Sequence, residues 1–366
     1  MINTINLEMK RNYEKIFRNK VVKWFITFLF YINFDSSRIL WYNVNIKKEG
    51  FTMNDKIDIV VTYLNDQDQQ WQEEFNKYRQ YEVSKGWIDP NSIQAFGEER
   101  IRNWGFTQYW FRGVEKCCPW VNKIFFIIQN EHHIPEWLNI TNPKIRIVYH
   151  NEFIPKKLLP TFNATTIGLY INQIKDLSDN YIMCDDDYFF LNPIDETKFF
   201  INNKPQHEDN QVPYGYFYDG DEFLHIMNNC FDFEKKYDDG KTKYHFYHLP
   251  TARNKTLEQK ILKDNYNDIL NSQRVSRFRY STNLDANIYS NILKLTHNAD
   301  ILPKSTIYGN SAYVALQPNI DFYQYKDKEM VCFNDVDLVT GHFEEIQKSL
   351  IEFLKYKFPN KSSFEV

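Results

Sequence analysis

Three consecutive aspartates, Asp185, Asp186 and Asp187, stand between two apolar, aromatic-rich runs in the stretch Asn180–Leu191. A strand that ends in several carboxylates is costly to bury, because unpaired carboxylates in a low-dielectric site are strongly destabilised. A divalent cation would offset that cost, and oxygen ligands of this kind suit Mg²⁺ or Mn²⁺. A solvated turn is the alternative, since aspartates are also common in turns. The rest of the chain favours the metal site.

Charged and titratable side chains elsewhere extend this chemistry. Arg112, Arg277 and Arg279 carry guanidinium forks that suit phosphate oxygens. His248 is a candidate proton acceptor, because histidine titrates near neutrality without any perturbation. Carboxylates, metal, arginine and histidine together suit a phosphoryl or glycosyl transferase with a nucleotide-activated donor. The structural alternatives are two solvated arginines on a strand face and a histidine that is merely one of nine.

Composition and missing motifs exclude several classes of protein. The net charge of −4 argues against a nucleic-acid partner, whose binding needs a basic face. Five cysteines without a C-x-x-C pair argue against a disulfide framework or a zinc site, and favour a reducing, cytoplasmic location. The chain has no G-x-x-x-x-G-K-[ST] loop, so a P-loop kinase is excluded. It also has no G-x-S-x-G elbow.

Strands and helices alternate from Lys56 onward, and these elements must position the polar residues. Apolar, β-branched runs predict strands at 57–64, 123–128, 144–149 and 181–184. The alternation predicts an α/β fold with a mostly parallel sheet and helices on both faces. Ligands of such sheets bind beyond the carboxyl ends of the strands. Because Asn65–Asp68 and Asp185–Asp187 both follow strand ends, we expect one crevice to hold both.

The chain divides into an extension and one large domain. In residues 1–52, six lysines and arginines precede an apolar run, 24–34, that is shorter than the roughly 20 residues a membrane span needs. This basic and apolar extension is interpreted as an interfacial helix on an anionic membrane, as a helix packed on the main domain, or as sequence upstream of a second start at Met53. Residues 53–366 are predicted to form a single catalytic domain, in which the breaker-rich stretch 204–247 is a loop-rich insertion or lid.

Four blocks of sequence occur in an order that is typical of one family. Ile57–Asn65 with Asp68 and Trp71 is similar to I-D-x-V-x-T-W-V-D-G-x-D-x-x-W. A long block from Arg102 ends at Asp186-Asp187, in the position of N-D-D. The third block holds His248-Leu-Pro and Arg277-Phe-Arg279, which are similar to H-x-P and R-F-R. The fourth is Cys332-Phe-Asn334-Asp335, which is similar to C-x-N-D. The chain therefore resembles the Stealth proteins, sugar-1-phosphate transferases of bacterial capsules and cell-surface polysaccharides that are related to the GlcNAc-1-phosphotransferase catalytic core.

The resemblance implies a fold, a reaction and a set of site residues. The fold is a nucleotide-binding sheet of the glycosyltransferase-A-like or Rossmann-like kind. The reaction moves a sugar-1-phosphate from a UDP-sugar, such as UDP-GlcNAc, to a hydroxyl of a growing lipid-linked polysaccharide, and releases UMP. The implied metal and pyrophosphate ligands are Asp186, Asp187, Asn334 and Asp335. The other catalytic residues are His248 as the base and Arg277 and Arg279 as phosphate partners. The implied nucleotide pocket holds Asp58, Thr62, Asn65, Asp68, Arg112 and Asn163.

Departures from the family pattern leave other functions open. The family's Asp and Gly in the first turn are Asn65 and Asp66 here, and the Asn before the two aspartates is Asp185. Carboxylates expected at Gly105–Thr107 and Gly168, and the Ser expected at Ala164, are absent. The alternatives are a metal-dependent glycosyltransferase that releases UDP, and a degenerate polysaccharide-binding relative without activity. The predicted location is cytoplasmic with a peripheral contact to the plasma membrane, and the oligomeric state is not predicted.

Overall fold

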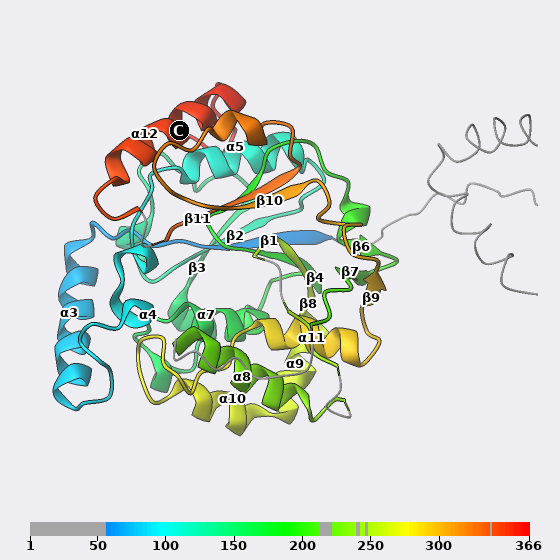
Figure 1. Ribbon diagram of the computed structural model, residues 1–366. Coiled ribbons are helices and arrows are strands. Elements are labelled where there is room, and N and C mark those ends of the chain that lie inside the picture. Colours follow the sequence, from blue (N-terminus) through cyan, green and yellow to red (C-terminus); the bar gives the residue numbers. More distant parts are fainter. Residues whose placement is uncertain (1–55, 213–221, 239–241, 246–247, 337–338) are drawn as a thin grey trace, which may run out of the picture. The chain divides into compact units, whose positions relative to one another are not determined.

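A five-stranded sheet forms the centre of the computed structural model, which describes residues 56–212, 222–238, 242–245, 248–336 and 339–366 (Figure 1). The extension 1–52 and Met53 lie outside the described residues. The strand order is β3-β2-β1-β4-β8, and the first four strands are parallel while β8 is antiparallel to β4. Their bounds are Ile145–Tyr149, Ile124–Ile128, Ile57–Thr62, Asn180–Cys184 and Thr251–Asn254. The predicted mostly parallel sheet is confirmed.

Buried strands explain why this sheet needs cover on both faces. Every residue of β2 (IFFII) is buried, and so are the first five residues of β1. Val60 lies between Phe125 of β2 and Met183 of β4 in the parallel register. Such continuous apolar strands are typical of parallel sheets with helices on both sides. The predicted run 57–64 ends as a strand at Thr62, two residues early, because the chain there turns toward the polar segment Asn65–Asp68.

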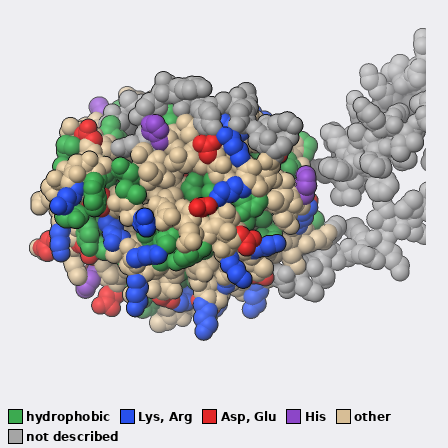
Figure 2. Space-filling model, turned by 90° about the horizontal axis from the view of Figure 1, so that it is seen from below, with side chains coloured by type: hydrophobic (Ala, Val, Ile, Leu, Met, Phe, Trp, Pro, Cys, Tyr) green, Lys and Arg blue, Asp and Glu red, His purple; other side chains and the backbone are tan. Residues whose placement is uncertain are grey.

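Helices cover both faces of the sheet, as predicted (Figure 1). One layer contains α5 (Thr107–Cys117) and α12 (Phe343–Lys357), whose apolar side chains share a core with Ile59 and Val61 of β1. The helices of the other layer pack around Val60 and are α7 (Ala164–Tyr170), α8 (Glu222–Glu234), α9 (Lys255–Asp264), α10 (Tyr266–Gln273) and α11 (Asn287–Leu295). From below this layer, Figure 2 shows basic side chains spread among acidic and hydrophobic ones, so the helices turn a mixed polar surface outward.

Two small sheets extend the molecule beside the central one. The first has the order β10-β11-β5, with bounds Ser311–Ala315, Met330–Asn334 and Tyr188–Phe190. The second has the order β6-β7-β9, with bounds Phe200–Ile201, Lys204–Glu208 and Asp300–Leu302. The three aspartates 185–187 join β4 of the central sheet to β5 of the first small sheet. Asn334 is the last residue of β11 in the same small sheet and Asp335 follows it, so two polar segments meet where the sheets adjoin.

The remaining helices lie at one end of the molecule, near the carboxyl ends of the strands. They are α3 (Gln69–Ser84), α4 (Ile93–Phe96) and α6 (His150–Phe153). Trp71, Phe75 and Phe96 form a separate aromatic core with Phe278, in which the ring centroids of Phe75 and Phe278 are 5.1 Å apart. This core fixes α3 and α4 against the Arg277–Arg279 segment.

The predicted insertion 204–247 contains more regular structure than its composition suggests. It includes β7 and α8, and α8 buries Ile226, Met227 and Phe231. The carboxylate of Glu234 accepts a hydrogen bond from Asn291 of α11. Part of this stretch therefore belongs to the lower helical layer, and its role as a lid stays a prediction.

Two further predictions concern cysteines and membrane spans. All five cysteines lie in the described part of the chain, where they are buried and unpaired. Within the same described residues, none of the helices combines the length and the apolar composition that crossing a membrane requires.

Candidate functional site

A pocket of about 260 Å³ opens beyond the carboxyl ends of β1 and β4. It is lined by the central sheet, by the β10-β11-β5 sheet and by the segments after α3 and before α5. It therefore lies where the sheet topology places ligands. Eight of the residues singled out in the sequence line it, and these are Thr62, Asp185, Asp186, Asp187, His248, Arg279, Asn334 and Asp335. The fold thus brings together the aspartates, the histidine and one arginine from segments far apart in the sequence.

The three adjacent aspartates of this pocket disfavour one another's ionised forms. All three side chains are half-buried. Burial, together with the negative charge of Asp185, raises the pKa of Asp186 to about 7. Burial and both neighbouring aspartates raise the pKa of Asp187 well above its ordinary value. Adjacent carboxylates that cannot all ionise cheaply are the situation that a bound cation relieves.

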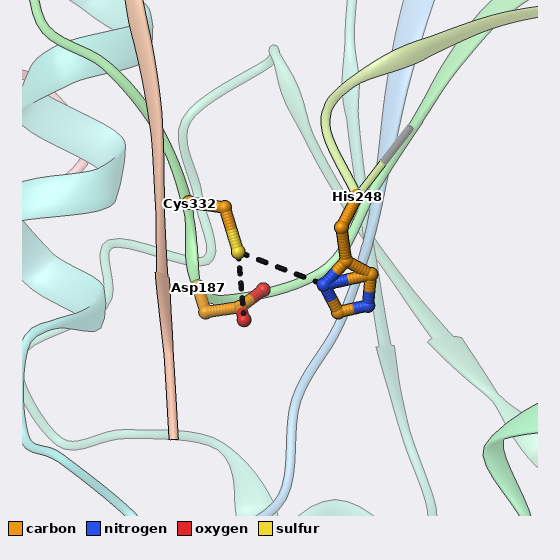
Figure 3. A group of neighbouring side chains, drawn as sticks. All are labelled: Asp187, His248 and Cys332. Carbon is orange, nitrogen blue, oxygen red and sulfur yellow. Dashed lines mark hydrogen bonds between the residues drawn. The ribbon is translucent and has the colours of Figure 1, made fainter. Parts of the chain in front are cut away.

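Asp187 and His248 line the pocket, and Cys332 contacts both of them, so the three side chains form a triad (Figure 3). The thiol of Cys332 donates to Asp187 Oδ2 at 3.3 Å, and its sulfur lies 3.7 Å from His248 Nδ1. One thiol carries one proton. When that proton goes to Asp187, the sulfur is left to accept from the Nδ1–H of His248, and the lone pair of the imidazole is then on Nε2.

The surroundings of His248 favour the neutral imidazole. Burial lowers its pKa, and the charges of Arg100 and Arg279 act in the same direction, whereas Asp185 and Asp285 act in the opposite one. The ring of Tyr188 meets the imidazole edge-on, with 5.3 Å between the ring centroids. A neutral imidazole with one free nitrogen can accept a proton near neutral pH.

The arginine side of the pocket has its own supports. Arg279 donates from Nη1 to Gln94 Oε1 at 2.8 Å, and both residues line the pocket. The carboxylate of Asp335 accepts from Trp104 Nε1 at 3.0 Å and lies 3.7 Å from Arg102 Nη1. Burial raises the pKa of Asp335, while Arg102 opposes that shift. Asp335 therefore already has a cationic neighbour, in contrast to Asp186.

A buried glutamate positions the segment that carries Arg279. Glu82, near the end of α3, is 2% exposed and accepts from Ser276 Oγ at 2.6 Å and from Arg277 N at 2.9 Å. Phe278 is fully buried in the aromatic core below. Because Phe278 packs into this core, the side chains of Arg277 and Arg279 on either side of it lie in different environments.

Six predicted residues do not line the pocket, and four of these bond elsewhere in the fold. Asp58 is buried at the amino end of β1, where its carboxylate accepts from Asn122, Lys123 and Ser178. Arg112 forms a two-bond pair with Glu365. Asn163 caps α7 and donates to Asn283. Arg277 donates to the carbonyl of Lys157. Each of these side chains is used to hold chain segments together.

Asn65 and Asp68 border the pocket through a histidine. Asp68 caps α3 by accepting from the backbone N–H of Gln70 and Trp71, and its Oδ2 lies 3.3 Å from Nε2 of His133. Asn65 donates its backbone N–H toward Nδ1 of the same ring. His133 lines the pocket, so Asn65 and Asp68 contact a lining residue without lining the pocket themselves.

Several lining residues were not singled out from the sequence. Tyr63, Arg100, Arg102, Trp104, His133 and His150 all line the pocket. His150 could have been found, because it directly follows the strand β3, just as Tyr63 follows β1. Arg100 ends the short 3-10 helix Glu98–Arg100 and Arg102 lies two residues beyond it, so no strand end marks either of them.

The donor set fits a hard divalent cation. Asp185–Asp187 and Asp335 offer carboxylate oxygens, and Asn334 offers an amide oxygen. The Oδ1 atom of Asp187 is buried and has no hydrogen-bond partner in the part of the chain that the structure describes. A buried, unpartnered carboxylate oxygen is an unusual cost, and a metal ion would remove it.

The chain has relatives of assigned activity over most of its length. Residues 100–208 match the family model described as Stealth protein CR2, conserved region 2. A capsular polysaccharide phosphotransferase, WcwK of Streptococcus pneumoniae, is 30% identical over 339 residues, which cover 86% of this chain and 100% of the relative. Another WcwK protein of that species is 29% identical over 350 residues, covering 85% and 98%. The solved apo WbbM bifunctional glycosyltransferase covers 84% of this chain and 53% of its own at 10% identity and a TM-score of 0.37, too low for any argument.

Proposed function

The chain belongs to the Stealth family and is a transferase of phosphorus-containing groups, and on this premise we propose that it moves a sugar-1-phosphate from a UDP-sugar to a hydroxyl of a capsular or cell-surface polysaccharide. The products are a phosphodiester link and UMP. The observation that carries the proposal is the pocket in which three aspartates, His248 and Arg279 meet.

His248 is the proposed base. The acceptor hydroxyl gives its proton to Nε2 of the neutral imidazole while its oxygen attacks the β-phosphorus of the donor. The bond from the β-phosphorus to the bridging oxygen breaks, and UMP leaves with that oxygen. The bond between the sugar and the β-phosphate is kept, so sugar and phosphate are transferred together. Cys332 and Asp187 hold His248 in the tautomer that this step needs.

Arg279 and Arg100 are the proposed partners of the phosphate oxygens, because both line the pocket and are permanently charged. Asp185, Asp186 and Asp187, with Asn334, are the proposed ligands of Mg²⁺ or Mn²⁺. A bound cation would offset the charge of the pyrophosphate and stabilise the leaving phosphate. The proposed nucleotide end of the pocket is formed by Thr62, with Asn65 and Asp68 acting through His133.

The acceptor and the location are further parts of the proposal. We propose a lipid-linked polysaccharide acceptor, a cytoplasmic site of action, and a peripheral membrane contact through residues 1–52, which lie outside the described residues. Deleting residues 1–52 should then lower the fraction of protein recovered with membranes. An unchanged membrane fraction would refute the contact without touching the reaction.

The nucleotide product tests the reaction. A panel of UDP-sugars is incubated with Mg²⁺ or Mn²⁺ and a polysaccharide acceptor, and UMP and UDP are separated. We expect acceptor-dependent UMP from the wild type, loss of it in His248→Ala, and its retention in His342→Ala, which removes an exposed histidine outside the pocket. UDP in place of UMP would establish a glycosyltransferase instead. Neither nucleotide across the panel would favour a binding protein without activity.

A further inference from the structure

The triad of Asp187, His248 and Cys332 brings together three different kinds of metal ligand. The carboxylate, an imidazole nitrogen and a sulfur all lie within 4.8 Å of one another. They come from the β4–β5 turn, the segment before β8 and the strand β11, which are separated by at least 61 positions in the sequence. No spacing motif in the chain marks these three residues as a group. The missing C-x-x-C pair, which argued against a zinc site, therefore does not exclude a site built from distant segments.

Two of the three separations match those of a tetrahedral zinc site. Zinc–sulfur bonds of about 2.3 Å and zinc–nitrogen or zinc–oxygen bonds of about 2.0–2.1 Å, at tetrahedral angles, place the sulfur about 3.5 Å from each of the other two ligand atoms. The sulfur of Cys332 lies 3.7 Å from His248 Nδ1 and 3.3 Å from Asp187 Oδ2. The sulfur is therefore already placed for zinc relative to both partners, and the ligand atoms of Asp187 and His248 lie within 4.8 Å of each other.

The ligand types favour zinc over the hard cation of the reaction. Thiolate and imidazole select soft or borderline ions, whereas Mg²⁺ and Mn²⁺ prefer oxygen. Cys332 is fully buried, and the pocket borders the triad on its open side, so a fourth position would remain for water or substrate.

We propose that Asp187, His248 and Cys332 form a second, Zn²⁺-selective site, and that zinc bound there inhibits the transferase. Binding itself rests only on the triad, whereas the inhibition rests on the proposed function. A metal at Nδ1 leaves the imidazole proton on Nε2, so His248 has no lone pair for the acceptor's proton. The same ion occupies Asp187, which the hard cation also needs.

Binding exchanges a proton for the metal. The zinc–sulfur bond forms as the S–H bond of Cys332 breaks, and the proton leaves to solvent. The affinity for Zn²⁺ should therefore rise with pH. No electrons are transferred in this step, and no co-reactant is needed.

The first experiment measures metal binding by the full chain without any donor or acceptor. Zn²⁺ is titrated against a chromogenic chelator, and Co²⁺ is added as a spectroscopic substitute. We expect one tight site per chain and a thiolate-to-cobalt charge-transfer band in the near ultraviolet. Cys332→Ser should lose the band and lower the zinc affinity by more than tenfold, since even outer-shell partners change metal affinity by about 10–100-fold.

The matched control is Cys117→Ser, which removes an equally buried cysteine at the end of α5, outside the pocket. It should keep the cobalt band and the zinc affinity. Equal zinc binding in Cys332→Ser and wild type, or a cobalt complex without the thiolate band, would overturn the proposal. Should Cys332→Ser fail to fold, zinc X-ray absorption of the wild type decides, because the site requires one sulfur neighbour at about 2.3 Å.

The second experiment tests the inhibition separately. Equimolar Zn²⁺ should abolish UMP release by the wild type in the presence of millimolar Mg²⁺, and a chelator should restore it. Each variant is compared with its own activity before zinc is added, and Cys332→Ser should be less sensitive than Cys117→Ser. Tight zinc binding with undiminished UMP release would overturn the inhibition alone. A chain without any transferase activity would refute the proposed function and leave the binding result standing.

Discussion

Arg277 and Arg279 are two positions apart, yet their side chains have different partners. Arg279 bonds Gln94 at the pocket, whereas Arg277 donates to the carbonyl of Lys157 and lies over the ring of Tyr78. The buried Phe278 between them divides the two environments. The sequence offered the pair as equal candidates, because two guanidinium groups on one strand-like face look alike until the packing of the residue between them is known.

Substituting these arginines separately should show this difference. Arg279→Gln is expected to lower kcat/KM by about 10²-fold or more, the loss typical of one oriented donor to a developing oxyanion. Arg277→Gln, the matched control, should change kcat/KM little, because its side chain does not line the pocket. Steady-state kinetics with varied UDP-sugar measures both. Equal losses in the two variants would contradict the assignment.

The pH dependence of the reaction belongs to His248. Its lowered pKa means that the base is neutral at pH 7, and activity falls only as the pH drops through that pKa. The charge of Arg100 helps to lower the pKa. Arg100→Gln should therefore raise the pKa and move the acid limb of the kcat/KM profile toward higher pH. An acid limb at the same pH in Arg100→Gln and wild type would argue against His248 as the base.

At the scale of elements, sequence reasoning succeeded where a general rule of topology applies. Because parallel strands bring their carboxyl ends to one edge, the strand ends predicted one crevice for Asn65–Asp68 and Asp185–Asp187. The three aspartates line the pocket, whereas Asn65 and Asp68 reach it only through His133. Sequence reasoning failed where a side chain's role depends on a distant partner. Arg112 is bound by Glu365, which is 253 positions away, and nothing local in α5 marks that pairing. Cys332 likewise shows its role only beside Asp187 and His248.

The pair of Arg112 and Glu365 fastens the end of the chain to α5. The Nε and Nη2 atoms of Arg112 donate to the two carboxylate oxygens at 2.8 and 2.7 Å, and Nη1 donates to the carbonyl of Phe358. Phe364 packs on Phe111 of the same helix, with 5.5 Å between the ring centroids. The Glu365 side chain is 2% exposed. The C-terminal residues therefore belong to the core of this layer.

Arg112→Met should thus act on stability and not on nucleotide binding. Leaving the Glu365 carboxylate buried and unpaired is expected to cost about 3–5 kcal/mol in the free energy of unfolding. The double variant Arg112→Met/Glu365→Met should recover much of that loss, because no charge is then stranded. Urea unfolding measures both, and the KM for the donor should stay unchanged. A raised KM with unaltered stability would restore Arg112 to the nucleotide pocket.

At the scale of the whole molecule, the aspartate turn connects the central sheet to the sheet of β5, β11 and β10. A cation held by this turn and by Asn334, the last residue of β11, would join the two sheets. Ligands that bind only the folded state stabilise it by about 2.7 kcal/mol at a concentration of 100 Kd. Mg²⁺ is therefore expected to raise the melting temperature of the entire domain.

That stabilisation should depend on pH with a definite sign. Without a cation, the pKa of Asp186 is about 7 in the fold, against an ordinary value of 3.8. The proton retained on Asp186 therefore stabilises the fold fully below pH about 4, and this contribution is lost as the pH rises through 7. Magnesium must displace the retained proton at low pH, but it finds an ionised carboxylate at high pH. The rise in melting temperature on adding Mg²⁺ should therefore be larger at pH 8 than at pH 5.5. Asp186→Asn should remove most of this difference, while Asp327→Asn, at an exposed site outside the pocket, should keep it. The same rise at both pH values in the wild type would mean that the aspartate turn does not hold the cation.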